Sequence, residues 1–285
     1  MSPILAELRV GDHVLVVHAY STFMILAWAV ALTVGTLVAR RRGDSWWRAL
    51  SVLSISLVAA IVGARMLDLA VDWGYYAEDL SRIYGLEFRG FSLYGGLILA
   101  AGAGYLASRA FALSPWRLAD GAVPAIAAGI VFARIGCFLN GCCFGTVTEL
   151  PWGVTYPPGS GAWAQQIVGG QTGLLGLTGM VRPVHPTQLY EAFAAIVMGA
   201  VALGLLSRRD ASGKGRFPAG MPFMAFALGF TLFRLGNDFL RVQPPTASMP
   251  LWFNPVLHLA VSAGTLGVII TLTCRRLPLS HPSAA

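Results

Sequence analysis

The chain has 285 residues, of which 56% are hydrophobic and only 12% are charged, and its mean hydropathy is +0.66. A composition this apolar excludes an ordinary soluble domain and indicates an integral membrane protein. The net charge of +7 suits basic loops beside anionic lipid headgroups, so membrane lipids are the expected surroundings and no nucleic-acid partner is expected.

Apolar runs recur along the chain with no long polar linker between them. A helix of about 20 apolar residues crosses the roughly 30 Å hydrocarbon core of a bilayer with its backbone hydrogen bonds satisfied. The sequence therefore predicts an all-α, polytopic membrane protein with seven transmembrane helices in a single transmembrane domain, residues 1–285. The predicted spans are residues 18–40, 49–71, 91–113, 118–137, 188–207, 218–240 and 255–274.

The segment before the first span carries a single basic residue, Arg9, and no small-residue cleavage site. It therefore differs from a secretory signal peptide, and we expect the first span to be retained. Its apolar character predicts that residues 1–17 form an interfacial N-terminal segment that lies along the membrane surface.

Basic residues divide unequally between the two sets of loops that seven spans create. Loops rich in Lys and Arg face the cytoplasm, which places the N-terminus outside and the C-terminus in the cytoplasm. The poorer set, with the N-terminal segment, contains Arg9, Arg82, Arg89 and Arg182. The richer set contains Arg40, Arg41, Arg42, Arg48, Arg109, Arg117, Arg208, Arg209, Lys214, Arg216, Arg275 and Arg276.

Polar side chains from six of the predicted spans fall at one level, near the outer ends of the helices. Ionisable residues are costly inside a membrane, which makes them functional candidates. The alternative is structural, with Arg65 and Asp68, or Arg234 and Asp238, forming ion pairs between adjacent helical turns. The set comprises Arg65, Asp68, Tyr94, Arg134, His185, Gln188, Tyr190, Glu191, Arg234, Asp238, Arg241, Asn254 and His258.

Four motifs lie in or beside this polar set. They are RIGCFLNGCCFG at residues 134–145, PWGV at 151–154, HPTQLYE at 185–191 and FRLGNDFLR at 233–241. Weaker matches are GAR at 63–65 and FSLYGG at 91–96. In order and spacing, over about residues 63–260, these motifs resemble those of the prolipoprotein diacylglyceryl transferases of bacterial membranes.

The resemblance implies an enzyme of lipoprotein biosynthesis in the bacterial inner membrane, with its active site toward the outer leaflet. Such an enzyme transfers a diacylglyceryl group from phosphatidylglycerol to the thiol of the lipobox cysteine in a prolipoprotein signal peptide. Phosphatidylglycerol and the prolipoprotein are then the expected partners, and no cofactor or metal is expected. The loop of residues 141–187 would be an outer cap where the prolipoprotein docks.

The resemblance also implies roles for residues at matching positions. Arg134 and Arg241 match arginines that the family requires, and a guanidinium is suited to grip the phosphate and to stabilise its departure. The catalytic candidates are Arg134, Arg241, His185 and Tyr94. The candidates for substrate binding are Asn140, Gly141, Gly145, Gly95, Gly96, Arg65, Gln188, Tyr190, Glu191, Arg234 and Asp238.

The sequence departs from the family pattern at Tyr94, where the family usually has a histidine proposed as a catalytic group. A neutral phenol is a poor base near neutral pH. His185, with an ordinary pKa of about 6.5, is then the best available proton acceptor.

A second departure is the cysteine content of the first motif. Cys137, Cys142 and Cys143 stand where the family usually has residues that are not thiols. Four explanations remain open: a disulfide that leaves one thiol over, inert packed thiols, a metal site, and a thiol that takes part in catalysis.

Three other functions compete with the transferase. A membrane thiol oxidoreductase would require a redox-active cysteine pair, but the sequence has no Cys-x-x-Cys motif. A transporter would place polar residues at the midplane of the membrane and not at one face. The nearest alternative keeps the fold and the phospholipid donor but uses a different acceptor, which the change at Tyr94 favours.

Overall fold

Each of the seven predicted spans coincides with one long helix of the computed structural model. The structure describes residues 4–10, 13–83, 93–168, 181–208, 216–242 and 252–274. The seven helices are α1 (Ala19–Arg41), α2 (Trp46–Val71), α4 (Leu93–Ala110), α5 (Pro115–Asn140), α7 (Thr187–Ser207), α8 (Met221–Asp238) and α9 (Phe253–Cys274).

Five of these helices, α1, α2, α5, α7 and α9, are long and apolar enough to cross a membrane, with mean hydropathies of 1.9 to 2.1 over their best segments. The chain is therefore a polytopic helical membrane protein. Helices α4 and α8 have 18 residues each; α4 contains Arg109, and α8 contains Arg234 and Asp238. A helix of 18 residues is about 27 Å long, close to the thickness of the hydrocarbon core.

The helix ends differ from the predicted span ends by up to three residues, for reasons of local chemistry. Helix α5 begins at Pro115, three residues before the predicted span, because proline is favoured in the first turn of a helix. It continues to Asn140 and stops at Gly141, whose φ of 70° is left-handed. Helix α8 begins later than predicted, at Met221, after Gly220 with a φ of 94°.

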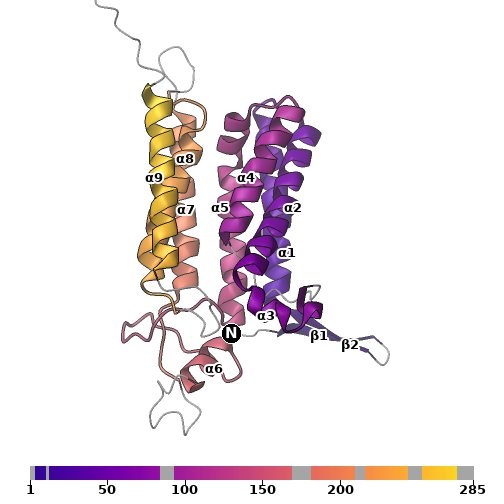
Figure 1. Cartoon of the computed structure of the whole chain (residues 1–285), viewed down its shortest axis with the longest axis vertical. Coiled ribbons are helices and arrows are strands. Elements are labelled where there is room, and N and C mark those ends of the chain that lie inside the picture. Colours follow the sequence, from indigo (N-terminus) through magenta and orange to yellow (C-terminus); the bar gives the residue numbers. More distant parts are fainter. Residues whose placement is uncertain are drawn as a thin grey trace, which may run out of the picture.

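The helices form two groups (Figure 1), α1, α2, α4 and α5 on one side and α7, α8 and α9 on the other. Contacts of α5 with α7 and α8 join the groups. Helices α2 and α4 approach closely, because a Cβ on Gly63 would lie 2.3 Å from the carbonyl oxygen of Gly95. Large apolar side chains such as Val58, Ile98 and Phe193 point away from the protein and are 60–70% exposed, as expected of surfaces that face lipid.

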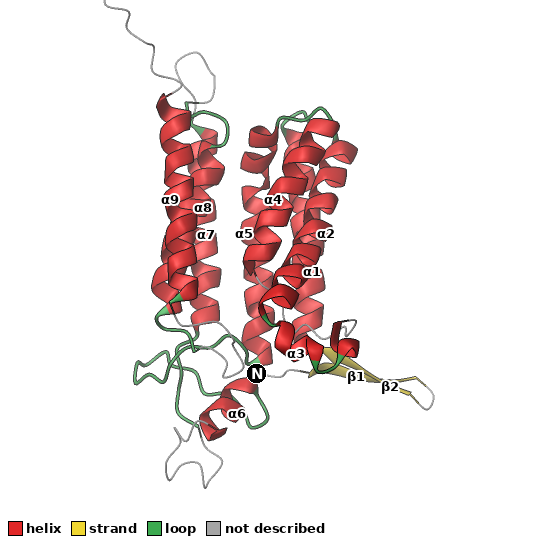
Figure 2. Cartoon of the chain, viewed as in Figure 1, coloured by secondary structure: helices red, strands yellow, loops and turns green. Residues whose placement is uncertain are grey.

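Short elements gather at one end of the bundle (Figure 2), which we call the cap end. They are the antiparallel hairpin of β1 (Ile4–Val10) and β2 (His13–His18), α3 (Trp73–Ala77), the 3₁₀ helix η1 (Leu80–Ile83) and α6 (Gly161–Val168). The hairpin occupies the predicted interfacial segment, for which the sequence had indicated no strand. Helix α6 interrupts the predicted cap loop, of which residues 169–180 lie outside the described part.

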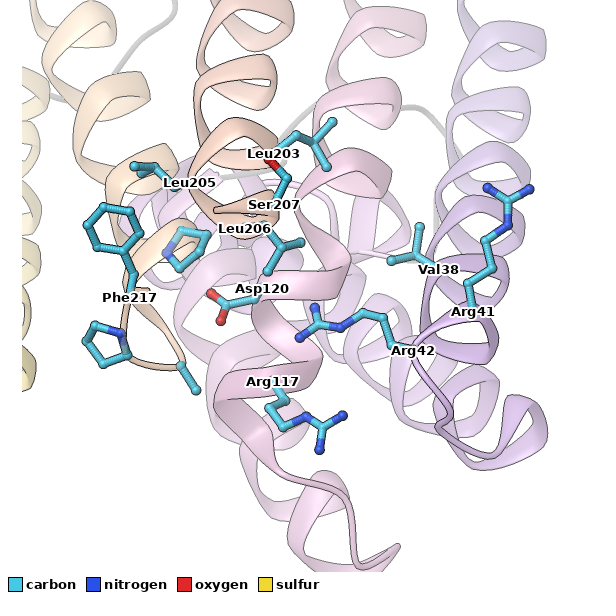
Figure 3. A pocket seen from close by; sticks show the side chains of 13 residues that line it. Val38, Arg41, Arg42, Arg117, Asp120, Leu203, Leu205, Leu206, Ser207 and Phe217 are labelled. Carbon is cyan, nitrogen blue, oxygen red and sulfur yellow. The ribbon is translucent and has the colours of Figure 1, made fainter. Parts of the chain in front are cut away.

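The opposite end holds a basic cavity of about 780 Å³. Arg41, Arg42 and Arg117 line it together with the buried Asp120 (Figure 3). The Asp120 carboxylate accepts hydrogen bonds from the backbone N–H groups of Gly220, at 2.8 Å, and Phe223, at 3.0 Å. Asp120 thus caps the start of α8, which accounts for an acidic residue inside α5.

A labelling experiment tests which end of the bundle faces out. A membrane-impermeant thiol reagent should label Glu149→Cys at the cap end in intact cells, above the level of the parent chain. It should label Ser114→Cys at the opposite end only after the cells are permeabilised, because the loops at that end carry the basic residues. The reverse pattern would contradict the predicted orientation.

Candidate active site at the cap end of the bundle

Glu191, about one turn after the start of α7, is the centre of a cluster of charged side chains. Its carboxylate is 1% exposed and forms an ion pair with Arg134 of α5 at 2.7 Å. The other carboxylate oxygen pairs with Arg234 of α8 and lies 3.5 Å from Arg241, just beyond α8. Asn237 donates a further hydrogen bond to that oxygen at 3.1 Å. One carboxylate therefore ties the ends of α5, α7 and α8 together.

The cluster contains more positive than negative charge. Three guanidinium groups surround the Glu191 carboxylate. The cluster has one further carboxylate, that of Asp238, which lies 3.4 Å from Arg234. The side chains of Arg134 and Arg241 are 19% and 17% exposed, so neither is fully enclosed by the protein. An excess of guanidinium donors in a partly dry setting is suited to bind phosphate in pairs of hydrogen bonds.

A hydrogen-bonded chain of three side chains leads from Asp238 toward α4. Asp238 accepts a hydrogen bond from His258 Nε2 of α9 at 2.8 Å. The other ring nitrogen, Nδ1, lies 2.7 Å from the hydroxyl of Tyr94. Both Tyr94 and His258 are buried. Tyr94, the residue that replaces the usual histidine of the family pattern, thus lies against another histidine.

The segment after α5 is fixed by the first residues of α7. Thr187 Oγ1 donates to the carbonyl oxygen of Cys143 at 2.7 Å, and Gln188 Nε2 donates to that of Cys142 at 2.6 Å. Gly145 pairs with His185 and Arg241 through the backbone. A Cβ on Gly145 would lie 2.7 Å from both the Cβ of His185 and the backbone carbonyl oxygen of Leu240, so a glycine here allows these segments to approach closely.

The thiols of Cys137, Cys142 and Cys143 lie together, with all three Sγ atoms within 4.8 Å of one another. All four cysteines of the chain, Cys274 included, are free, so no disulfide joins the three. Hydrogen bonds from the Cys137 and Cys142 thiols, with Arg241 and Arg134 nearby, hold the pKa of Cys143 well below its ordinary value. The side chain of Asn140 also interacts with the Cys142 thiol.

His185, the base predicted from the sequence, lies beside a different tyrosine, Tyr190. Its Nδ1 lies 3.1 Å from the hydroxyl of Tyr190, which also accepts a hydrogen bond from Trp152 Nε1 at 2.8 Å. The PWGV and HPTQLYE motifs are therefore joined at this point. No contact described for the His185 ring reaches an arginine of the cluster.

Other predicted site residues hold helices and loops in place. Arg65 donates to the hydroxyl of Tyr76 at 3.1 Å and to the carbonyl oxygen of Arg82 at 2.8 Å. Burial and a hydrogen bond to Asp68 raise the pKa of Tyr76 to about 12, so the phenol stays neutral. Gly95 and Gly96 face α2, where a Cβ on Gly96 would lie 2.9 Å from the carbonyl oxygen of Ala60.

Sequence reasoning missed the roles of Asn237 and His258 in the site. Asn237 is flanked by charged residues of the FRLGNDFLR motif, and its position one turn before Arg241 was the available signal. His258 could have been found by asking what lies beside Tyr94, but no local pattern links residues 164 positions apart.

The fold and the site together define a polytopic helical membrane protein with a cluster of arginines around a buried carboxylate at the cap end of its bundle. The sequence profile of the prolipoprotein diacylglyceryl transferases matches residues 8–273. The chain belongs to this family.

Several relatives carry the name phosphatidylglycerol–prolipoprotein diacylglyceryl transferase. The relative from Geobacter sulfurreducens is 29% identical over 239 residues, which cover 83% of this chain and 81% of the relative. The relative from Thermus thermophilus is 31% identical over 242 residues, which cover 78% of each protein. A longer relative from Rhodopirellula baltica is 26% identical over 93% of this chain, which spans 58% of that protein.

Replacing Glu191 should destabilise the protein. Glu191→Gln removes the negative charge that holds three buried or half-buried guanidinium groups together, and breaking such a buried network costs about 3–5 kcal/mol. We expect a clear fall in the midpoint of thermal unfolding in detergent. Glu149→Gln is the matched control, because the Glu149 side chain is 93% exposed. Equal midpoints for the two variants would contradict the structural role of Glu191.

Proposed function

We propose that the chain transfers the diacylglyceryl group of phosphatidylglycerol to the lipobox cysteine thiol of a prolipoprotein. Membership in the family supports this activity. The observation that carries it is the excess of guanidinium donors around Glu191, because a phospholipid phosphate is the anion that a membrane-embedded site would meet.

In this reaction the sulfur of the acceptor forms a bond to the glycerol carbon that carries the phosphate. The carbon–oxygen bond breaks, and glycerol phosphate leaves with the electron pair. Arg134 and Arg241 would bind the phosphate and stabilise the negative charge that grows on its ester oxygen, as donors already in place do most effectively. Arg234 pairs with both Glu191 and Asp238, so its charge is already balanced and it positions the other two.

The thiol proton needs an acceptor, and the chain of Tyr94, His258 and Asp238 provides a route for it. A phenol bonded to an imidazole can pass a proton on when it receives one, and the Asp238 carboxylate stabilises the imidazolium that results. This route replaces the usual histidine at the Tyr94 position with a histidine one hydrogen bond further away. His185, the acceptor predicted from the sequence, lies with Tyr190 and is the alternative.

The proposal includes the membrane arrangement. All seven long helices would cross the bacterial inner membrane, with the cap end toward the outer leaflet. The unequal distribution of arginines supports this orientation, since the basic cavity lies at the opposite end. The segment around α6 would then face the side on which a secreted precursor presents its lipobox.

The change at Tyr94 favours one second candidate, transfer from the same donor to a different acceptor. Incubation of the purified protein with phosphatidylglycerol and a lipobox peptide, followed by mass spectrometry of the peptide, separates the two. A peptide heavier by one diacylglyceryl group supports the proposal. Release of glycerol phosphate with an unchanged peptide would point to the other acceptor.

The phosphate-binding role predicts that Arg134→Ala and Arg241→Ala each lower transfer by about 100-fold or more, the cost of removing one preorganised donor to a developing anion. Arg→Lys should recover little, because a point charge does not reproduce the paired donors. Arg182→Ala is the control, since the Arg182 side chain is 45% exposed and pairs with Glu149. Near-normal turnover of both alanine variants, at normal thermal stability, would rule out the role.

The proton route predicts that His258→Gln lowers transfer more than His185→Gln does. Both residues are histidines at the cap end, so the comparison separates the two candidate acceptors. Glutamine can keep a hydrogen bond but cannot take up the proton. The measurement is the initial rate of transfer by the two variants, compared at equal thermal stability. If instead His185→Gln is the variant that loses activity, His185 is the acceptor.

A further inference from the structure

The three cysteines of the first motif are brought together by the way α5 ends. Cys137 is buried in the last turn of the helix, and Gly141, in the left-handed region, reverses the chain. The backbone N–H of Cys142 then bonds to the carbonyl oxygen of Cys137 at 3.1 Å. As a result, the thiols of Cys142 and Cys143, five and six positions further along the chain, lie close to the thiol of Cys137.

The conformation of Cys143 indicates that this return is enforced. Its φ is 61°, a left-handed value that costs a residue other than glycine on the order of 1–3 kcal/mol. The surrounding structure holds it there, because Thr187 and Gln188 bind the carbonyl oxygens of Cys143 and Cys142. Strained residues that are held by their neighbours cluster at functional sites.

The spacing of the thiols matches the first coordination shell of a metal. All three Sγ atoms lie within 4.8 Å of one another. Tetrahedral zinc, with zinc–sulfur bonds of about 2.3 Å, needs sulfurs about 3.8 Å apart, which small side-chain rotations would give. Among the described residues no other His, Cys, Asp or Glu belongs to the group. A fourth position would thus stay open, the arrangement of catalytic and not of structural zinc sites.

The charge around the cluster suits such a complex. Three thiolates and one Zn²⁺ carry a net charge of −1. Arg134 and Arg241 lie close enough to Cys143 to act on its charge, so they would balance the complex. Cys142 and Cys143 are half-buried, which leaves the group reachable. Inert packing accounts neither for the left-handed Cys143 nor for three thiols that meet beside arginines.

We propose that Cys137, Cys142 and Cys143 bind a zinc ion as thiolates and that its fourth position binds the acceptor thiol. This inference rests on the proposed function, whose acceptor is a cysteine. It would place the attacking sulfur beside Arg134 and Arg241, which are assigned to the donor phosphate.

Zinc would supply what a thiol acceptor lacks. A thiol that binds the metal does so as a thiolate, so it has released its proton to water before the reaction. The metal-bound sulfur uses an electron pair to form the bond to the glycerol carbon. The carbon–oxygen bond breaks, glycerol phosphate leaves with its electrons, and the neutral thioether dissociates from the metal. No oxidant or reductant takes part.

Cobalt(II) is the probe for the site, because it occupies zinc positions and its bonds to thiolates give visible and ultraviolet absorption. The reduced, metal-free full chain in detergent should bind one cobalt per chain with thiolate-to-metal bands, and zinc should displace it. Cys137→Ser, Cys142→Ser and Cys143→Ser should each weaken cobalt binding by at least about tenfold. Even changes to residues that only support the metal ligands typically lower metal affinity by about that factor. Cys274→Ser, exposed at the far end of α9, should bind as the parent does.

The absence of thiolate bands, or unchanged affinity in all three serine variants, would overturn the inference. So would a disulfide between two of the three cysteines in protein purified without reductant, found by mass spectrometry of its peptides. Each variant is compared by thermal unfolding, so that a loss of fold is not counted as a loss of ligand.

A second measurement separates this inference from the proposed function. A lipobox peptide should change the cobalt spectrum, and the same peptide with serine in place of its cysteine should not. Metal-free protein that transfers lipid at the full rate would overturn the role of zinc and leave the transferase standing. A spectrum that responds to the cysteine peptide, in protein that never transfers lipid, would support the metal site and count against the proposed function.

Discussion

The site depends on one buried carboxylate. Without Glu191, the guanidinium groups of Arg134, Arg234 and Arg241 would repel one another in a setting where water screens them little. Since Arg134 comes from α5, Arg234 from α8 and Arg241 from the segment just beyond α8, the carboxylate also fixes where the ends of these helices lie. It supplies too little charge to neutralise the group, which leaves the cluster able to attract an anion.

The first two turns of α7 link this charge cluster to the cysteine-containing segment. Thr187 and Gln188 hold the carbonyl oxygens of Cys143 and Cys142, and Glu191, one turn further on, holds the arginines. The helical repeat places these side chains at successive levels of the same helix end. The HPTQLYE motif is therefore a support on which two sets of chemical groups are arranged side by side.

The sequence was sufficient to predict where the long helices lie, because apolar runs of membrane length have few alternatives. It also predicted that Arg134, Glu191, Arg234 and Arg241 belong to one region. It could not predict which arginine Glu191 binds, since those contacts depend on the packing of α5, α7 and α8. Local patterns missed the β1–β2 hairpin and left open whether the three thiols pair, because both depend on how distant backbone segments fold back.

The two departures from the family pattern concern the same proton. A histidine at the Tyr94 position would take the proton from the acceptor thiol, and the phenol is much less able to do so. In the proposed mechanism, two features of the structure would reduce this deficit. His258 and Asp238 extend the phenol into a chain that can carry the proton away. The three cysteines offer a metal position that would release the proton when the thiol binds. A weaker base is sufficient where the acceptor is already a thiolate. On this view the three cysteines compensate for the tyrosine at position 94.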